Sequence, residues 1–133
     1  MSRLVIRYVP DAHDEVGQLW FELLTDNFSG SGFFWSDLSE WPSLIGKFRA
    51  YPLTETVSQS WGYNAREGDD AVLALSVSPG GPIEASITVA DLYFPQQRLT
   101  ATLRTDYPSL NRMLLDLAVM IERREGDATL LGF

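Results

Sequence analysis

Cysteine is absent from this chain of 133 residues. Without thiols, the protein can form no disulfide, use no cysteine nucleophile and bind no metal through thiolates. Long apolar runs are absent too, since no stretch reaches the roughly 18 apolar residues that a transmembrane helix needs. The N-terminal segment also lacks the apolar core and the small-residue cleavage site of a signal peptide. We therefore expect a cytoplasmic protein that does not bind membranes.

Basic side chains are scarce. The chain has ten Lys and Arg residues and 18 Asp and Glu residues, which gives a formal net charge of −8 and a pI near 4.4. This charge repels phosphate backbones, and the basic pair Arg123–Arg124 is flanked by Glu122 and Glu125. We therefore expect no nucleic-acid partner. The acidic balance is explained either by solubility alone or by attraction to a basic partner protein.

Groups that could carry out chemistry are few. The single histidine, His13, lies in a turn beside Asp11 and Asp14, and general-base catalysis would need a nucleophile or a metal held close to it. The stretch Gly30–Ser31–Gly32 lacks the third glycine and the strand–helix–strand context of a phosphate-binding loop. The sequence therefore predicts no catalytic residue, no cofactor and no metal. A catalytic role for His13 stays open.

The apolar pattern predicts one α+β domain over residues 1–133, long enough to bury a core without disulfides or metals. Alternating apolar residues predict strands at 4–9, 56–63, 71–78, 83–93 and 98–106, and 127–133 is either a short edge strand or a docked end. The turn from Pro79 to Pro82 should join two of these strands as a hairpin. We expect an antiparallel sheet of about five or six strands, with two helices packed on one face.

The first of these helices is predicted at residues 36–51. Either Ser36 or Asp37 can cap it, and Asp37 with Glu40 has the spacing of a capping box. Pro42 has no N–H to donate, so it is tolerated only in about the first turn.

The second helix is predicted at residues 107–124, where Ser109 would cap its start and Gly126 would end it. Its apolar side chains recur at helical spacing and should form one buried stripe. They are Leu110, Met113, Leu114, Leu117, Met120 and Ile121.

The secondary structure of residues 14–26 is ambiguous from the sequence. Val16, Leu19 and Leu23 fit a helical period, but Leu19, Phe21 and Leu23 also alternate as in a strand. Periodicity alone slightly favours a helix.

Aromatic residues cluster in the stretch NFSGSGFFWSDLSEWPS, residues 27–43. An alternating strand cannot bury Phe33, Phe34 and Trp35 on the same face, so at least one of them should point away from the core. An exposed aromatic side chain with a charged rim suits a protein-binding hot spot. We read Asp69–Asp70 as an acidic turn before a strand rather than a cation site. The candidate partner-binding residues are Phe34, Trp35, Asp37, Glu40, Trp41, Asp69 and Asp70.

Three stretches together resemble a known family. Gly32 to Ile45 contains WSDLSEWPSLI, Leu73 to Leu92 contains LALSV and GPIEASITV, and Thr105 to Ile121 begins TDYPSL. In this order they resemble the small immunity proteins that protect bacteria from their own polymorphic toxins, specifically the wall-associated-protein type immunity family and related uncharacterised families. The resemblance implies a single α+β domain with a strand at Gln18 to Thr25. It also implies a non-enzymatic protein that binds a toxin domain, often a basic nuclease, and occludes its active site.

The leading hypothesis is thus a protein that binds and neutralises a basic toxin. An acidic homodimer of the secretion-chaperone or regulatory type is the first alternative, with the LLGF tail or the strand around Trp61 at its interface. A cofactor-free enzyme or small-ligand carrier is the second alternative, using His13 or a pocket between sheet and helices.

Overall fold

The computed structural model describes residues 2–13, 15–49, 51–61, 70–77, 81–94 and 96–133, and within them it contains eight strands and two helices. In chain order the elements are β1 (Arg3–Val9), β2 (Gly17–Leu24), β3 (Ser29–Ser36), α1 (Trp41–Phe48), β4 (Val57–Trp61), β5 (Ala71–Val77), β6 (Ile83–Ala90), β7 (Arg98–Thr105), α2 (Tyr107–Arg123) and β8 (Gly126–Leu131). The predicted α+β class is confirmed.

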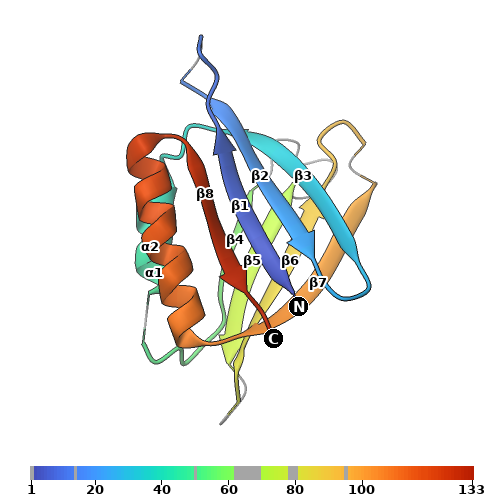
Figure 1. Cartoon of the computed structure of the whole chain (residues 1–133), viewed down its shortest axis with the longest axis vertical. Helices are drawn as coiled ribbons and strands as arrows, with labels where there is room; N and C mark the ends of the chain where they lie inside the picture. The colour runs from blue at the N-terminus through green and yellow to red at the C-terminus, as the bar shows by residue number, and fades with distance from the viewer. Residues whose placement is uncertain (1, 14, 50, 62–69, 78–80, 95) are drawn as a thin grey trace.

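The strands form two antiparallel sheets rather than one. The first sheet has the order β3-β2-β1-β8, and the second has the order β4-β5-β6-β7. Figure 1 shows the sheets as two layers, with both helices along one side of the pair and α2 next to β8. The expectation of one sheet of five or six strands is therefore wrong. Alternation shows that a strand has a buried face, but not which sheet covers that face.

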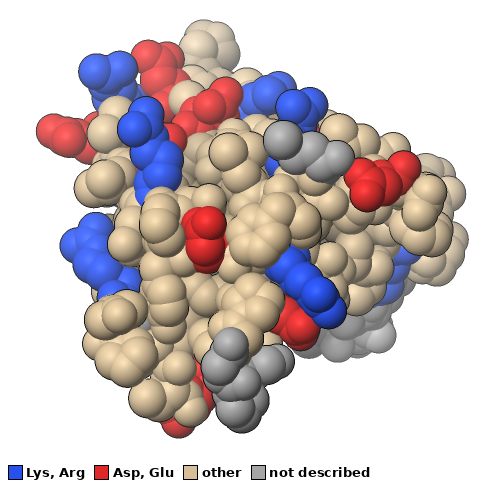
Figure 2. All heavy atoms as spheres, turned by 60° about the horizontal axis from the view of Figure 1, so that its bottom comes forward, with Lys and Arg blue, Asp and Glu red and all other residues tan. Residues whose placement is uncertain are grey.

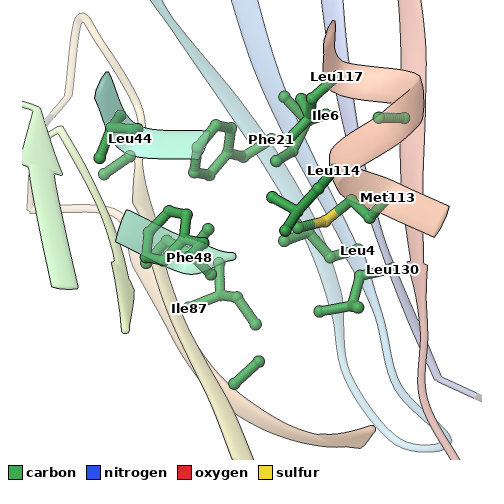
Figure 3. Packing of buried hydrophobic residues seen from close by; sticks show 14 of the residues in the cluster. Leu4, Ile6, Phe21, Leu44, Phe48, Ile87, Met113, Leu114, Leu117 and Leu130 are labelled. Atoms are coloured by element: carbon green, nitrogen blue, oxygen red, sulfur yellow. The ribbon is translucent and has the colours of Figure 1, made fainter. Parts of the chain in front are cut away.

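The core lies between the two sheets and the helices. Figure 3 shows side chains that converge there from β1, β2, β6, β8, α1 and α2. The predicted stripe on α2 is confirmed, because five of its six members are at most 1% exposed and the sixth, Ile121, is partly buried against the core. Burial of such side chains is the main force that holds sheets and helices together.

Residues 17–24 form the strand β2, so the slight preference for a helix is wrong and the strand implied by the resemblance is confirmed. Leu19, Phe21 and Leu23 all face the core. β2 pairs with β1 on one side and with β3 on the other, which satisfies its backbone groups in a way that a local period cannot reveal. Gly17 is required at its start, since a Cβ there would lie 2.6 Å from the Val9 carbonyl oxygen.

The other predicted strands are present. β5 and β6 pair as an antiparallel hairpin, with Val77 opposite Ile83, and residues 78–80 of its turn lie outside the described residues. β4 begins at Val57 and ends at Trp61, and the last two residues of the predicted strand, 62 and 63, are not among those described. The C-terminal segment forms β8, an edge strand paired with β1.

The first helix begins later than predicted. The Ser36 hydroxyl oxygen accepts a hydrogen bond from the Leu38 N–H, and Asp37 accepts one from Ser39, so both side chains stabilise turns that precede α1. Leu38 has a φ of 67°, which a helix cannot accommodate. α1 therefore starts at Trp41 without a side-chain cap, and Pro42 falls in the first turn as expected.

The second helix has the predicted position but a different cap. The carboxylate of Asp106 accepts a hydrogen bond of 2.8 Å from the Ser109 N–H, so Asp106 and not Ser109 is the N-cap residue. This hydrogen bond holds the pKa of Asp106 below its usual value. Arg124 adopts the left-handed conformation and ends the helix two residues before Gly126.

Candidate partner-binding site

Of the three aromatic residues predicted to contact a partner, only Trp35 is at the surface. Its side chain is 45% exposed, whereas Phe34 is 5% exposed and Trp41 is completely buried. Alternation along β3 turns Phe34 inward and Trp35 outward, and the start of α1 turns Trp41 toward the core. Phe34 and Trp41 therefore belong to the core and are not surface anchors, which corrects that part of the prediction.

The buried aromatic residues form a stack behind Trp35. Trp61 lies between Trp41, at 5.2 Å between ring centroids, and Phe34, at 5.6 Å. Phe21 packs edge-on against both Phe34 and Trp61. The Trp61 Nε1–H donates a hydrogen bond of 3.1 Å to Glu40 Oε1. We call Phe34, Trp41 and Trp61 the interior stack. It links β3, α1 and β4.

A hollow with a volume of about 290 Å³ opens beside this stack. Its lining comes from β3, from β4, from Glu40 just before α1 and from Asp70 just before β5. We call it the Trp35 hollow. Its lining residues are Phe34, Trp35, Glu40, Gln59, Ser60, Trp61 and Asp70.

The structure brings four of the predicted site residues together in this hollow, namely Phe34, Trp35, Glu40 and Asp70. Asp70 is buried, and its backbone joins the end of β4 to β6. The Asp70 N–H donates to the Trp61 carbonyl, and the Asp70 carbonyl accepts from Ala90. Asp69, the seventh predicted residue, lies outside the described residues.

Asp37 lies just beyond the hollow, exposed at the turn that leads into α1. Hydrogen bonds from the side chain and the backbone of Ser39 hold the pKa of the Asp37 carboxyl below its usual value, and Arg124 adds a smaller electrostatic contribution. Asp37 is therefore a negative charge at neutral pH.

Acidic residues gather at this end of the molecule. Figure 1 shows the β1–β2 hairpin, the end of β3 and the junction of α2 with β8 at the same end. The Arg124 guanidinium connects these three segments, because it follows α2 and donates hydrogen bonds to the carbonyl oxygens of Glu15 and Asp37. We define the acidic end as residues 10–16, 36–40 and 122–127 together with Asp70. Its described acidic residues are Asp11, Glu15, Asp37, Glu40, Asp70, Glu122, Glu125 and Asp127.

Arg123 and Arg124 are the only Lys or Arg residues within the described part of the acidic end. The opposite end differs. Figure 2 brings it forward and shows Lys and Arg side chains interspersed with Asp and Glu among many uncharged residues. Among the described residues, the negative charge is thus unevenly distributed, with its excess at the acidic end.

The predicted partner-binding residues did not include three aromatic residues that lie in contact outside the core, namely Phe33, Trp20 and Tyr93. Phe33 contacts Trp20, Trp35 and Tyr93, with ring centroids 4.7, 5.8 and 6.3 Å apart. Trp20 lies opposite Phe33 in the β2–β3 register, and Tyr93 is 71% exposed in the β6–β7 connection. The individual residues are visible in the sequence, but their contact depends on pairing between strands and could not be predicted.

Trp61, Gln59 and Ser60 were missed as well. The sequence places them on a strand without indicating that the strand ends against Trp35 and Glu40. His13 is exposed in the β1–β2 turn, where its backbone N–H donates to the Asp11 carboxylate.

Across the described residues, no group of three or more His, Asp or Glu side chains is positioned to hold a metal ion. Among those residues there is also no helix with the length and apolar character needed to cross a membrane. Comparisons with protein-family models, with curated proteins and with solved structures found no match to this chain.

Proposed function

We propose that this chain is a non-enzymatic cytoplasmic protein that binds a basic protein through its acidic end and thereby neutralises it. The observation that carries the proposal is the half-exposed Trp35, set beside a hollow with two carboxylates at the most acidic part of the molecule. A toxin domain is the partner that the resemblance to bacterial immunity proteins suggests. The complex would block the toxin's active site by covering it.

The arrangement supports both fast and stable association. Clustered carboxylates raise the encounter rate with a positively charged protein, more so at low salt. Binding energy in protein interfaces concentrates in a few residues, and tryptophan is prominent among them. Trp35 is held by the β2–β3 pairing and by its contact with Phe33, so little side-chain freedom is lost when a partner covers it.

Co-expression with the product of the adjacent gene tests the proposal. We expect the two proteins to co-purify and this chain to protect cells from that product. In the double variant Glu15→Gln/Glu125→Gln we expect slower association that depends less on salt. The double variant Glu55→Gln/Glu84→Gln removes the same charge away from the acidic end and should associate as the wild type does. If the adjacent product neither binds nor is neutralised, the proposal fails.

A homodimer is the second candidate, and exposed apolar side chains favour it. Leu131 at the end of β8 is 49% exposed, and Phe133 is 73% exposed. Trp61 is buried, so the tail rather than the Trp61 strand would form such an interface. Light scattering distinguishes the candidates. A stable dimer that dissociates in the Leu131→Ser variant would favour the homodimer hypothesis.

A further inference from the structure

We propose that the Trp35 hollow is the recognition pocket for one arginine side chain of the basic partner. This inference rests on the proposed function and specifies which group of the partner the acidic end recognises. Three properties of the hollow lead to it, namely its size, its aromatic walls and its hydrogen-bond acceptors.

The size of the hollow suits a side chain. Pockets for small-molecule ligands and cofactors usually have volumes of roughly 300–1,000 Å³. The Trp35 hollow has a volume of about 290 Å³, close to the lower end of that range. Three aromatic and four polar residues line it. A hollow at the small end of this scale has room for one inserted side chain.

The walls of the hollow suit a planar cation. Trp35 lines it with a side chain that is 45% exposed, and tryptophan is the aromatic residue that binds cations most strongly over its ring face. Trp61 also lines the hollow, but Trp41 and Phe34 cover the faces of its ring, so Trp61 supplies a fixed wall and Trp35 supplies the face for the cation. Trp61 cannot turn away easily, because it is stacked between Trp41 and Phe34 and its Nε1–H is bound to Glu40. The wall is therefore in place before the partner arrives, which reduces the entropy cost of binding.

Among the described residues, the polar lining supplies hydrogen-bond acceptors and includes no basic side chain. Glu40 accepts one hydrogen bond at each carboxylate oxygen, from Trp61 and from Ser39, and each oxygen can accept another. The Gln59 side-chain oxygen adds a further acceptor to the lining. A guanidinium has five N–H donors in one plane and can bond a carboxylate while it stacks on a ring. An ammonium group has no planar face to stack on a ring and cannot form a bidentate pair with a carboxylate, so arginine is favoured over lysine.

A titration of the full-length protein followed by NMR tests this inference without the partner. The probe is N-acetyl-arginine amide, and the matched control ligand is N-acetyl-citrulline amide, which has a neutral urea in place of the guanidinium. The signals followed are the indole N–H resonances of Trp20, Trp35, Trp41 and Trp61. Trp20 is an internal reference, because its Nε1–H is bound to Gln18 and it does not line the hollow.

We expect arginine amide to shift the Trp35 and Trp61 signals in a saturable way and to leave the Trp20 signal unchanged. Loss of one charged hydrogen-bond partner should weaken binding about tenfold, so citrulline amide should bind about tenfold more weakly. N-acetyl-lysine amide should also bind more weakly than arginine amide. Absence of a saturable shift, or equal affinity for arginine and either control ligand, overturns the inference.

Glu40→Gln is the informative variant. The glutamine side-chain oxygen can still accept the Trp61 hydrogen bond, so the variant removes the charge while keeping the wall in place. Arginine amide should bind it about tenfold more weakly. Glu84→Gln is the control variant, because it removes the same charge from the other end of β6. Glu84 lies six residues, or roughly 20 Å along the strand, from Ala90, whose N–H binds the Asp70 carbonyl. This variant should bind arginine amide as the wild type does. An unchanged affinity in Glu40→Gln contradicts the inference.

The two proposals can fail separately. If the adjacent gene product binds this chain but arginine amide does not enter the hollow, the protein-binding function stands and the arginine pocket is wrong. If arginine amide binds as expected but no basic protein is neutralised, the pocket stands and the proposed function is wrong.

Discussion

The stretch from Phe33 to Trp41 contributes to two adjoining regions with opposite properties. Phe34 and Trp41 enter the interior stack, whereas Trp35 and Glu40 border the hollow at the surface. One step along β3 separates Phe34 from Trp35 and moves the side chain from core to solvent. The comparison shows that aromatic content alone marks neither a core nor an interface. The position of each residue in its strand or helix decides between stability and binding.

Truncating the interior stack should have the largest effect. Trp41→Ala removes a fully buried indole that stacks on Trp61, so we expect the free energy of unfolding to fall by about 3–5 kcal/mol. Trp35→Ala, which truncates the exposed tryptophan, should cost less than about 1 kcal/mol. Urea denaturation followed by circular dichroism measures both. Equal losses for the two variants would show that the two regions are not separate.

A milder change at Trp41 sharpens this test. Among the described residues, the Trp41 Nε1–H has no hydrogen-bond partner, so the indole nitrogen adds no visible polar contact. Trp41→Phe keeps most of the apolar surface and should destabilise the protein clearly less than Trp41→Ala does. A loss as large as that of the alanine variant would indicate that the nitrogen has a partner.

The packing of β3 against β6 gives the next largest effect. A Cβ at Gly32 would lie 2.4 Å from the Ala90 carbonyl oxygen, so Gly32→Ala should destabilise the protein by about 1–3 kcal/mol. Gly46 in α1 is the matched control, since nothing lies within 4 Å of its Cβ position. Gly46→Ala should stabilise the protein by up to about 1 kcal/mol. Thermal or urea unfolding measures both, and a neutral Gly32→Ala contradicts the close contact.

Removing the cap of α2 should lower stability while leaving both aromatic regions unchanged. Asp106→Ala loses the hydrogen bond to the Ser109 N–H and should cost about 1 kcal/mol. Asp106→Asn can still cap the helix and should retain most of the stability. Neither variant should alter the affinity for a partner or for arginine amide. A change in affinity would indicate that the hollow depends on the far end of α2.

Acid should produce the smallest and most gradual effect. The pKa values of Asp37 and Asp106 are lower in the folded protein than in the unfolded chain, because each carboxylate accepts hydrogen bonds from a serine. Their contribution to stability is present above the unfolded pKa and is lost as the pH falls through the folded pKa. We therefore expect the urea midpoint to decrease below about pH 4. Asp106→Asn, which cannot titrate there, should show a shallower decrease.

Much of the fold followed from local patterns. The β5–β6 hairpin and the buried stripe of α2 were predicted because alternation and helical spacing are properties of the segments themselves. Local periodicity could predict neither β2, which only the resemblance implied, nor the division into two sheets, because both depend on which strands pair across long separations. The start of α1 was displaced and the cap of α2 was assigned to the wrong residue, because Ser36, Asp37 and Asp106 bind backbone groups in turns and caps that sequence spacing alone does not distinguish.

The site was predictable to a similar extent. Alternation predicted that Phe34 and Trp35 would face opposite sides, and it left open which side was the core. The convergence of Glu40, Trp61 and Asp70 could not be predicted, since these residues come from different elements that meet only after both sheets form. Composition predicted an acidic protein, but not that the acidic residues would gather at one end.

The most direct test of the central claim compares two exposed aromatic residues in binding to the partner. Trp35 lies at the acidic end, whereas Tyr51 is 78% exposed and packs against Tyr107 at the first turn of α2. The affinity of the adjacent gene product should be measured by calorimetry for Trp35→Ala and Tyr51→Ala. We predict a loss of at least about thirtyfold for Trp35→Ala, as for an interface hot spot, and less than about twofold for Tyr51→Ala. The reverse order, or equal losses, would contradict the claim that the acidic end around Trp35 is the binding surface.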